Sequence, residues 1–216
     1  MFRTADDAQF WNRAARKYST DPITDMAGYE RTLERVRHYL KGNETAFEFG
    51  CGTGTTALRL APSVGRMVAS DISGEMIAIA REKARDEGCG NVTFEVAQPE
   101  AGLWPDRSFD IAFGFNILHL VADRAAVLKS VHRLLRSGGL FISKTPCLKE
   151  MNLPLRLVLP LAVPLMQLIG KAPSVVTSLS EHDLEREISA AGFQIIEIAR
   201  HASRGKDVRP FIVARK

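Results

Sequence analysis

Three glycines at alternate positions, Gly50, Gly52 and Gly54, separate an apolar run from a helical pattern in the stretch FEFGCGTGTTALRL. Glycine adopts left-handed backbone conformations without steric cost, so such a turn lets a ligand approach the main chain. A helix that begins after the turn presents unpaired N–H groups to that ligand. The pattern therefore predicts that a nucleotide-type ligand binds where a strand meets a helix.

The spacing of the glycines distinguishes between nucleotide cofactors. A dinucleotide-binding turn reads G-x-G-x-x-G, which would require a glycine at the position of Thr55. This chain instead reads G-x-G-x-G and carries the acidic Glu48 just before the first glycine. An NAD-dependent dehydrogenase is therefore disfavoured.

The stretch EFGCGTG resembles the first motif of the class I S-adenosylmethionine-dependent methyltransferases. The resemblance continues in the family's order through MVASDIS, WPDRSFDIAFGFNILHLV and VLKSVHRLLRSGGLFIS, which are similar to the family's second-, fourth- and fifth-strand segments. Several motifs in register are far more specific than one glycine turn. The resemblance implies a Rossmann-like fold, S-adenosyl-L-methionine as the cofactor and methyl transfer as the activity.

The resemblance also assigns roles to residues that follow the glycine turn. Asp71 ends the second apolar run, where the family's acidic residue binds both ribose hydroxyls of the cofactor. Its alternative role is to cap the helix that begins near Ser73. Ile72 and Met76 are expected beside the adenine.

After its third strand the family often carries an aspartate that accepts the adenine amino group, whereas this chain has Gln98 followed by Pro99. A glutamine carbonyl accepts the same hydrogen bond, so we expect adenine to bind here with rearranged contacts. Cys51 lies within the glycine turn, where its small side chain fits, and joins the expected cofactor contacts.

The end of the fourth strand offers two further candidates, Asn116 and His119. Open α/β sheets bind ligands at the carboxyl ends of their strands, so Asn116 is expected to face the methionine end of the cofactor. His119 is a candidate catalytic base, or else a structural histidine. In this fold the N-terminal helix tends to cover the cofactor, so Tyr18 contacts the methionine moiety or packs, with Trp11, in the core.

The expected reaction needs few catalytic groups, because a sulfonium is already a strong methyl donor. The acceptor must be held about 3 Å from the methyl group with water excluded, and a base is needed only if the acceptor must lose a proton. No metal site is expected, since Cys51, Cys89 and Cys147 lack the paired spacing of a zinc site or a disulfide framework.

Apolar runs alternate with helical patterns along most of the chain, and this alternation predicts βαβ units. The expected strands lie in TAFEF, RMVAS, NVTFEV, FDIAFGF, GGLFISKT, FQIIEIA and VRPFIVAR. The last two runs can pair antiparallel at the edge of a parallel sheet. The predicted fold class is α/β, a Rossmann-like three-layer sandwich with a seven-stranded, mostly parallel sheet whose last strand is antiparallel.

We expect a single methyltransferase domain over residues 1–216. Helical spacing from Asp7 to Leu40, broken at Asp21-Pro22, predicts an N-terminal helical cap over residues 1–44. Residues 146–179 interrupt the alternation and are the expected substrate-covering insertion.

The charge of the chain is mildly basic, with a net charge of +4 and a pI near 9.1, but its cationic and anionic residues are interleaved. This favours a solvated surface over a nucleic-acid groove. The sequence FNILHL also differs from the Asn/Asp-Pro-Pro-aromatic segment of the family's nucleic-acid amino-group methylators. No nucleic-acid partner is expected, and the absence of a secretory signal pattern predicts a cytoplasmic protein.

The stretch NLPLRLVLPLAVPLMQLIG, residues 152–170, carries most information about the acceptor. A transmembrane span is rejected because Arg156 and the prolines Pro154, Pro160 and Pro164 interrupt the run, and the prolines predict short helical pieces instead of one helix. Two interpretations stay open: a buried cover over an apolar pocket, or an interfacial patch, over residues 153–170, that touches a bilayer. Both imply a lipophilic acceptor.

Three functions are consistent with these observations. The first is methyl transfer to a small, apolar acceptor, as in the family's small-molecule and quinone-biosynthesis branch. The second is methylation of a phospholipid or another membrane-resident substrate. The third is a protein that binds the cofactor without turnover.

Overall fold

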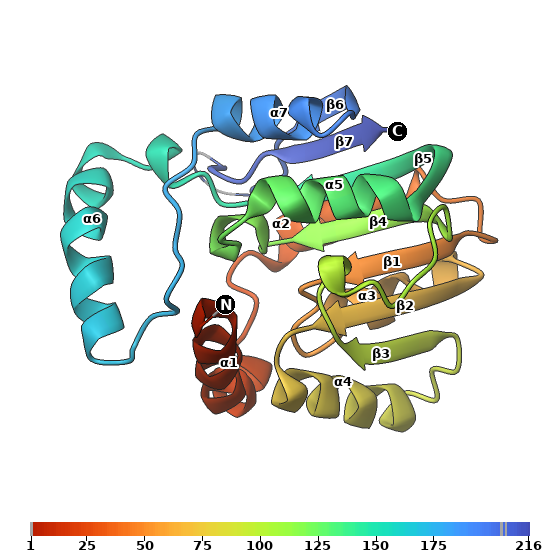
Figure 1. The fold of residues 1–216 in the computed structure, drawn as a ribbon, viewed down its shortest axis with the longest axis horizontal. Helices are drawn as coiled ribbons and strands as arrows, with labels where there is room; N and C mark the ends of the chain where they lie inside the picture. Colours follow the sequence, from red (N-terminus) through yellow and green to blue (C-terminus); the bar gives the residue numbers. More distant parts are fainter. Residues whose placement is uncertain (1, 204, 206) are drawn as a thin grey trace.

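The structure, a computed structural model, describes residues 2–203, 205 and 207–216. Within this part of the chain seven strands form one sheet (Figure 1): β1 Thr45–Phe49, β2 Arg66–Asp71, β3 Val92–Val96, β4 Phe109–Phe115, β5 Leu135–Lys144, β6 Gln194–Ala199 and β7 Phe211–Arg215. Their order is β3-β2-β1-β4-β5-β7-β6. β7 is antiparallel to both its neighbours, β5 and β6, while the other pairs are parallel. The predicted α/β fold with one antiparallel strand is confirmed.

The described helices are α1 Phe2–Thr20, α2 Met26–Arg37, α3 Thr55–Leu60, α4 Gly74–Asp86, α5 Arg124–Leu134, α6 Leu153–Leu168 and α7 Glu181–Ala190. Short 3-10 turns lie at η1 Ala61–Ser63, η2 Pro99–Ala101, η3 Leu118–Leu120 and η4 Leu148–Glu150. α7 begins with a capping box, because Ser180 and Asp183 exchange side-chain to backbone hydrogen bonds. This arrangement satisfies two of the N–H groups that a helix start leaves unpaired.

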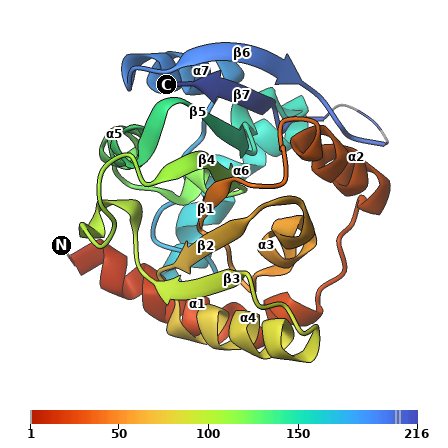
Figure 2. The same cartoon turned by 90° about the vertical axis from the view of Figure 1, so that its right-hand side faces the viewer.

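Alternating side chains along the central strands build a core on each face of the sheet. On β1, Ala46 packs among residues of α2, α3 and α4, whereas Phe47 and Phe49 pack among residues of α5 and α7. Figure 2 shows these two groups of helices on opposite sides of the sheet. The fold therefore has three layers, as predicted.

The carboxyl ends of the parallel strands face α1 and, farther out, α6 (Figure 1). α1 is fixed on α4, because Trp11 and Ala15 pack against Met76 and Ile79. Asn12 adds hydrogen bonds to the start of α4, since its Oδ1 accepts from the Ser73 hydroxyl at 2.7 Å and from the Glu75 N–H at 3.2 Å. This end of the sheet is thus partly covered by the N-terminal helix.

The prediction of short helical pieces between residues 152 and 170 is wrong, because α6 is one continuous helix that contains Pro160 and Pro164. These prolines are four residues apart, so both lie on one side of the helix, and both line the same cavity. The hydrogen bonds that proline cannot donate are therefore missing on one side only. Pro154 lies in the first turn of α6, where a backbone N–H would have no acceptor within the helix, so proline loses no hydrogen bond there.

Candidate active site

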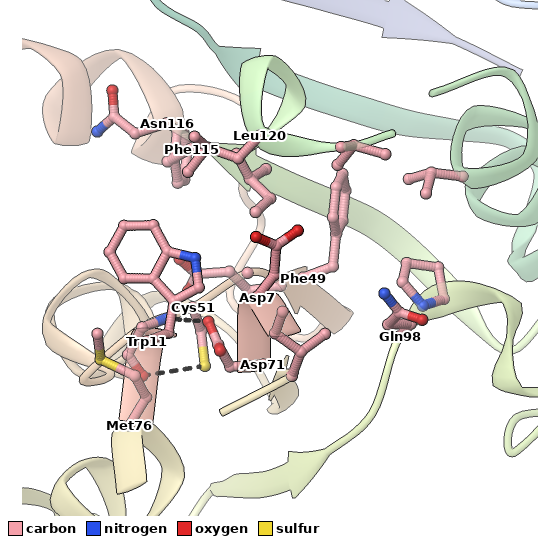
Figure 3. Close-up of a pocket in the computed structure, with 18 of the residues that line it drawn as sticks. Asp7, Trp11, Phe49, Cys51, Asp71, Met76, Gln98, Phe115, Asn116 and Leu120 are labelled. Carbon is pink, nitrogen blue, oxygen red and sulfur yellow. Dashed lines mark hydrogen bonds between the residues drawn. The ribbon is translucent and has the colours of Figure 1, made fainter. Parts of the chain in front are cut away.

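A cavity of about 280 Å³ lies at the carboxyl ends of β1, β2 and β4 (Figure 3). All the predicted cofactor contacts except Gly54 line it: Tyr18, Glu48, Gly50, Cys51, Gly52, Asp71, Ile72, Met76, Gln98, Pro99 and Asn116. Sequence segments far apart in the chain thus meet here because parallel strands end at one edge.

Asp71 is fixed at the end of β2 by two backbone groups. Its Oδ2 accepts a hydrogen bond from the Gly52 N–H at 2.9 Å, and its Oδ1 accepts one from the Ser73 N–H at 2.9 Å. Burial raises the pKa of this carboxyl, and these N–H bonds oppose the shift. The side chain that caps α4 is Ser73, whose hydroxyl accepts from the Met76 N–H, so Asp71 is not the N-cap.

Glu48 lies beneath the glycine turn and is almost completely buried. Within the described part of the chain its Oε2 has no hydrogen-bond partner. Burial, and secondly the charge of Asp71, raises the pKa of Glu48 to about 8. An unpaired buried carboxyl oxygen is costly, so a cationic or hydrogen-bond-donating ligand group here would be stabilising.

The three glycines of the turn have different roles. Each has a positive φ, but a Cβ at Gly54 would lie 2.8 Å from Ala80 and from the Phe94 ring, and Gly54 does not line the cavity. Gly54 therefore permits close packing of the turn before α3, and it is the one predicted cofactor contact that does not line this cavity. A Cβ at Gly50 would meet Ile117 at 2.5 Å. Of the three, only Gly52 would accept a Cβ without a close contact, because the nearest atom, in the Tyr18 ring, would lie at 3.7 Å, an ordinary van der Waals distance.

The N-terminal helix contributes aromatic side chains to the cavity. Trp11 and Tyr18 both line it, and their rings meet edge to face with centroids 6.3 Å apart. Burial, together with the charges of Asp71 and Glu48, raises the pKa of the Tyr18 hydroxyl. Both aromatic residues therefore face the cavity, although Trp11 also packs on α4.

The two candidates after β4 differ in position. Asn116 lines the cavity with a left-handed backbone, φ 53°, and Figure 3 shows its amide directed away from the other labelled side chains. His119 does not line this cavity, and its buried Nδ1 has no partner among the described residues. Burial lowers the pKa of His119 to about 4, so the ring is neutral at physiological pH and a weak base. The geometry disfavours His119 as the catalytic base.

Several lining residues were not predicted. Asp7 on α1 is the main one, since it is buried and Figure 3 shows its carboxylate near Trp11 and Phe49. The other unpredicted lining residues are Phe49, Thr56, Ala97, Glu100, Phe115, Ile117, Leu120, Val121, Ala122, Asp123 and Val127. Most are apolar residues at strand ends or in the connection between β4 and α5, which sequence patterns do not distinguish from core residues. For Asp7, the only feature in the sequence was its position in a helical pattern, which does not indicate that the side chain faces a cavity.

No residue of the expected cover, residues 146–179, lines this first cavity. α6 instead borders a second, open cavity of about 520 Å³, which is also lined by Leu148, Lys149, residues 174–176 and Ser178. Residues 174–178 connect the two regions, because the Ser174 N–H donates to Asp7 at 2.6 Å and the Thr177 N–H donates to the His119 carbonyl at 2.8 Å. This segment is called the strap below.

Fold and site together define an α/β protein that binds a nucleotide-like ligand at the carboxyl edge of its sheet. A family model described as a methyltransferase domain matches residues 40–205. The ubiquinone/menaquinone biosynthesis C-methyltransferase UbiE of Enterobacter sp. (strain 638) is 33% identical over 144 residues, which are 61% of this chain and 55% of the relative. The chain therefore spans about half the length of the curated relatives it matches.

Solved structures share the fold. A SAM-dependent methyltransferase from Methanosarcina mazei has a TM-score of 0.72 and 22% identity, with 84% of this chain and 96% of that chain covered. Another from Aquifex aeolicus has a TM-score of 0.68 and 19% identity, with 97% and 98% covered. The chain therefore belongs to the methyltransferase-domain family, and it shares the fold of these solved structures.

Proposed function

We propose that the protein transfers a methyl group from S-adenosylmethionine to a small, lipophilic acceptor, with the first cavity as the cofactor site. The observation that supports this most directly is the pair of acidic residues at the glycine turn. Glu48 has an unpaired oxygen suited to the methionine ammonium. Asp71 is held at the cavity by two backbone N–H groups, and its carboxylate oxygens keep lone pairs that can accept from ribose hydroxyls.

The remaining contacts follow from their places in the cavity. Ile72 and Met76 would flank the adenine, with Gln98 and Pro99 at its amino edge. Gly52, Cys51 and Gly50 would line the methionine end of the cofactor. Tyr18 would face this end with its ring, and Asn116 would face it with its backbone.

The bound cofactor supplies an electrophilic methyl group. The protein contributes positioning and exclusion of water, for which α1 with Trp11 and Tyr18 is the nearest cover. The cavity volume of about 280 Å³ is just below the roughly 300–1,000 Å³ range of ligand pockets, so this cavity suits a single ligand. The acceptor then needs further space, and the second cavity, which has a mixed polar and apolar lining, would supply it.

The relatives support a lipophilic acceptor. UbiE is named for methylation at carbon in ubiquinone and menaquinone biosynthesis, and the lining of the second cavity includes Leu159, Val163 and Val175. The proposal is tested by an acceptor screen that follows S-adenosylhomocysteine release, with reduced quinones, phenols and phospholipids as substrates. Turnover only with hydrophilic amines would contradict it.

A membrane-resident acceptor is the second candidate. The exposed apolar side chains of α6 favour it, because they lie on the segment that borders the second cavity. Turnover that requires vesicles or detergent would distinguish this candidate from a freely diffusing acceptor.

A further inference from the structure

One side of α6 is apolar and faces away from the rest of the protein. Leu157, Leu161, Leu165 and Leu168 are 65%, 78%, 62% and 85% exposed, and they recur at the spacing of one helix face. Figure 1 shows α6 beyond the carboxyl edge of the sheet, connected by two long segments. Contiguous apolar surface of this kind is unusual on a soluble monomer and marks an interaction site.

The opposite side of the helix faces inward. Arg156, Leu159, Val163 and Gln167 line the second cavity, and the Gln167 amide donates to the carbonyl groups of Pro173 and Ser174. α6 thus has an inner face that binds the strap and an outer face without a partner among the described residues. The outer face is available to another molecule.

The length of α6 determines how it can meet a bilayer. Its 16 residues span about 24 Å at 1.5 Å per residue, less than the roughly 30 Å hydrocarbon core. No helix among the residues that the structure describes is long and apolar enough to cross a membrane. A helix of this kind binds in the interface plane, with its apolar face about 5–10 Å below the headgroups.

The charges near α6 distinguish a lipid surface from a second copy of the chain. The sequence has no Asp or Glu between Glu150 and Glu181, whereas Arg156 lies in the helix and Lys171 just after it. Neither cation forms an ion pair within the described part of the chain. Two copies meeting through α6 would bring these like charges together, while anionic headgroups would neutralise them.

We infer that α6 docks the protein on an anionic bilayer, with Leu157, Leu161, Leu165 and Leu168 in the acyl boundary and Arg156 and Lys171 at the headgroups. Docking in this orientation leaves the second cavity next to the membrane surface. This consequence rests on the proposed lipophilic acceptor, which would enter from the bilayer without crossing water. The docking itself does not depend on the acceptor's identity.

The test is co-sedimentation of the full chain with vesicles of phosphatidylcholine alone or with one quarter phosphatidylglycerol. We expect binding to the anionic vesicles and at least tenfold weaker binding to phosphatidylcholine. The double variant Leu161→Ser/Leu168→Ser should bind anionic vesicles at least tenfold more weakly. Arg156→Gln/Lys171→Gln should lose most of the anionic preference, at about fivefold per charge.

Leu103→Ser is the matched control, because Leu103 is 59% exposed but lies outside α6, and its vesicle binding should equal that of the wild type. Calorimetry with S-adenosylhomocysteine checks that each variant is folded, and it separates failure of docking from failure of the proposed function. Wild-type protein that binds neither vesicle would overturn the inference. So would a dimer in light scattering that Leu161→Ser/Leu168→Ser dissociates, because the outer face would then bind a second copy.

Discussion

The carboxylate of Asp7 on α1 accepts a hydrogen bond from the backbone N–H of Ser174 in the strap, at 2.6 Å. These residues line different cavities, Asp7 the first and Ser174 the second. The bond therefore connects the N-terminal helix over the cofactor site to the segment that carries α6. Both elements come from outside the alternating core of the sheet.

Removal of this bond should loosen the strap. Asp7→Ala leaves the Ser174 N–H without its partner, at a net cost of about 1 kcal/mol, so amide hydrogen exchange of residues 174–178 should accelerate about fivefold. Asp7→Asn keeps an acceptor oxygen, so the amides of residues 174–178 should exchange much more slowly in this variant than in Asp7→Ala. Asp6→Ala is the control, because Asp6 is the exposed neighbour of Asp7, and it should leave the hydrogen exchange of residues 174–178 unchanged. Equal exchange in all three variants would show that the contact does not hold the strap.

Asp71→Ala should weaken S-adenosylhomocysteine binding by roughly 1.5–3 kcal/mol, because a charged acceptor for the ribose hydroxyls is lost. It should also lower the free energy of unfolding by about 1–2 kcal/mol, since the N–H groups of Gly52 and Ser73 lose their acceptor. Calorimetry at a temperature where the variant stays folded measures the first effect. Ser73→Ala removes the helix cap and the hydroxyl's bond to Asn12 but leaves the Asp71 carboxylate in place. It serves as the comparison: if its cofactor affinity falls equally, the role of Asp71 is structural.

Glu48 should make the stability of the cofactor-free protein fall as the pH rises. Burial raises its pKa from 4.5 to about 8, so between these values the folded protein holds a proton that the unfolded chain has released. The contribution is fully present below about pH 4 and is lost as the pH passes the folded value near 8. As the pH rises from about 5 to 9, the free energy of unfolding of wild type should fall by roughly 2–4 kcal/mol more than that of Glu48→Gln, at about 1.4 kcal/mol per pKa unit.

Denaturant unfolding at several pH values measures this difference. Parallel curves for wild type and Glu48→Gln would mean that the carboxyl is ionised in the folded protein at neutral pH. The pH dependence should also shrink when S-adenosylmethionine is present, because its cationic end would favour the ionised carboxylate.

The glycines of the turn should separate folding from binding. Gly54→Ala adds a Cβ that would lie 2.8 Å from Ala80 and Phe94, so we expect a loss of about 2–3 kcal/mol in unfolding free energy. Gly52→Ala makes only an ordinary van der Waals contact with Tyr18, so its unfolding free energy should fall by only about 1 kcal/mol from the positive φ, while its cofactor affinity falls at least tenfold. Unchanged cofactor affinity in a folded Gly52→Ala protein would contradict the placement of the ligand beside this backbone.

His119→Ala should retain measurable turnover, because the ring does not line the first cavity and burial holds its pKa near 4. Initial rates at saturating cofactor test this. Complete loss of turnover with intact cofactor binding would identify His119 as the base.

The sequence by itself determined the alternation of strands and helices, the G-x-G-x-G turn and the position of Asp71 at a strand end. These features follow from local periodicity, backbone requirements of glycine and fixed spacing within one βαβ unit, which neighbouring residues decide. The seven-stranded sheet with its antiparallel β7 was predictable for the same reason, since the last two runs are close in the chain.

The tertiary structure alone decided which residues meet across long separations. Gly54 proved to pack on Ala80 and Phe94, His119 proved to lie outside the first cavity, and Asp7 proved to bind Ser174. The sequence also could not show that α6 continues through Pro160 and Pro164 with its leucines facing outward. The sequence pattern of an apolar helix is the same whether its face is buried or exposed, because the burial of a side chain depends on what the rest of the chain packs against it.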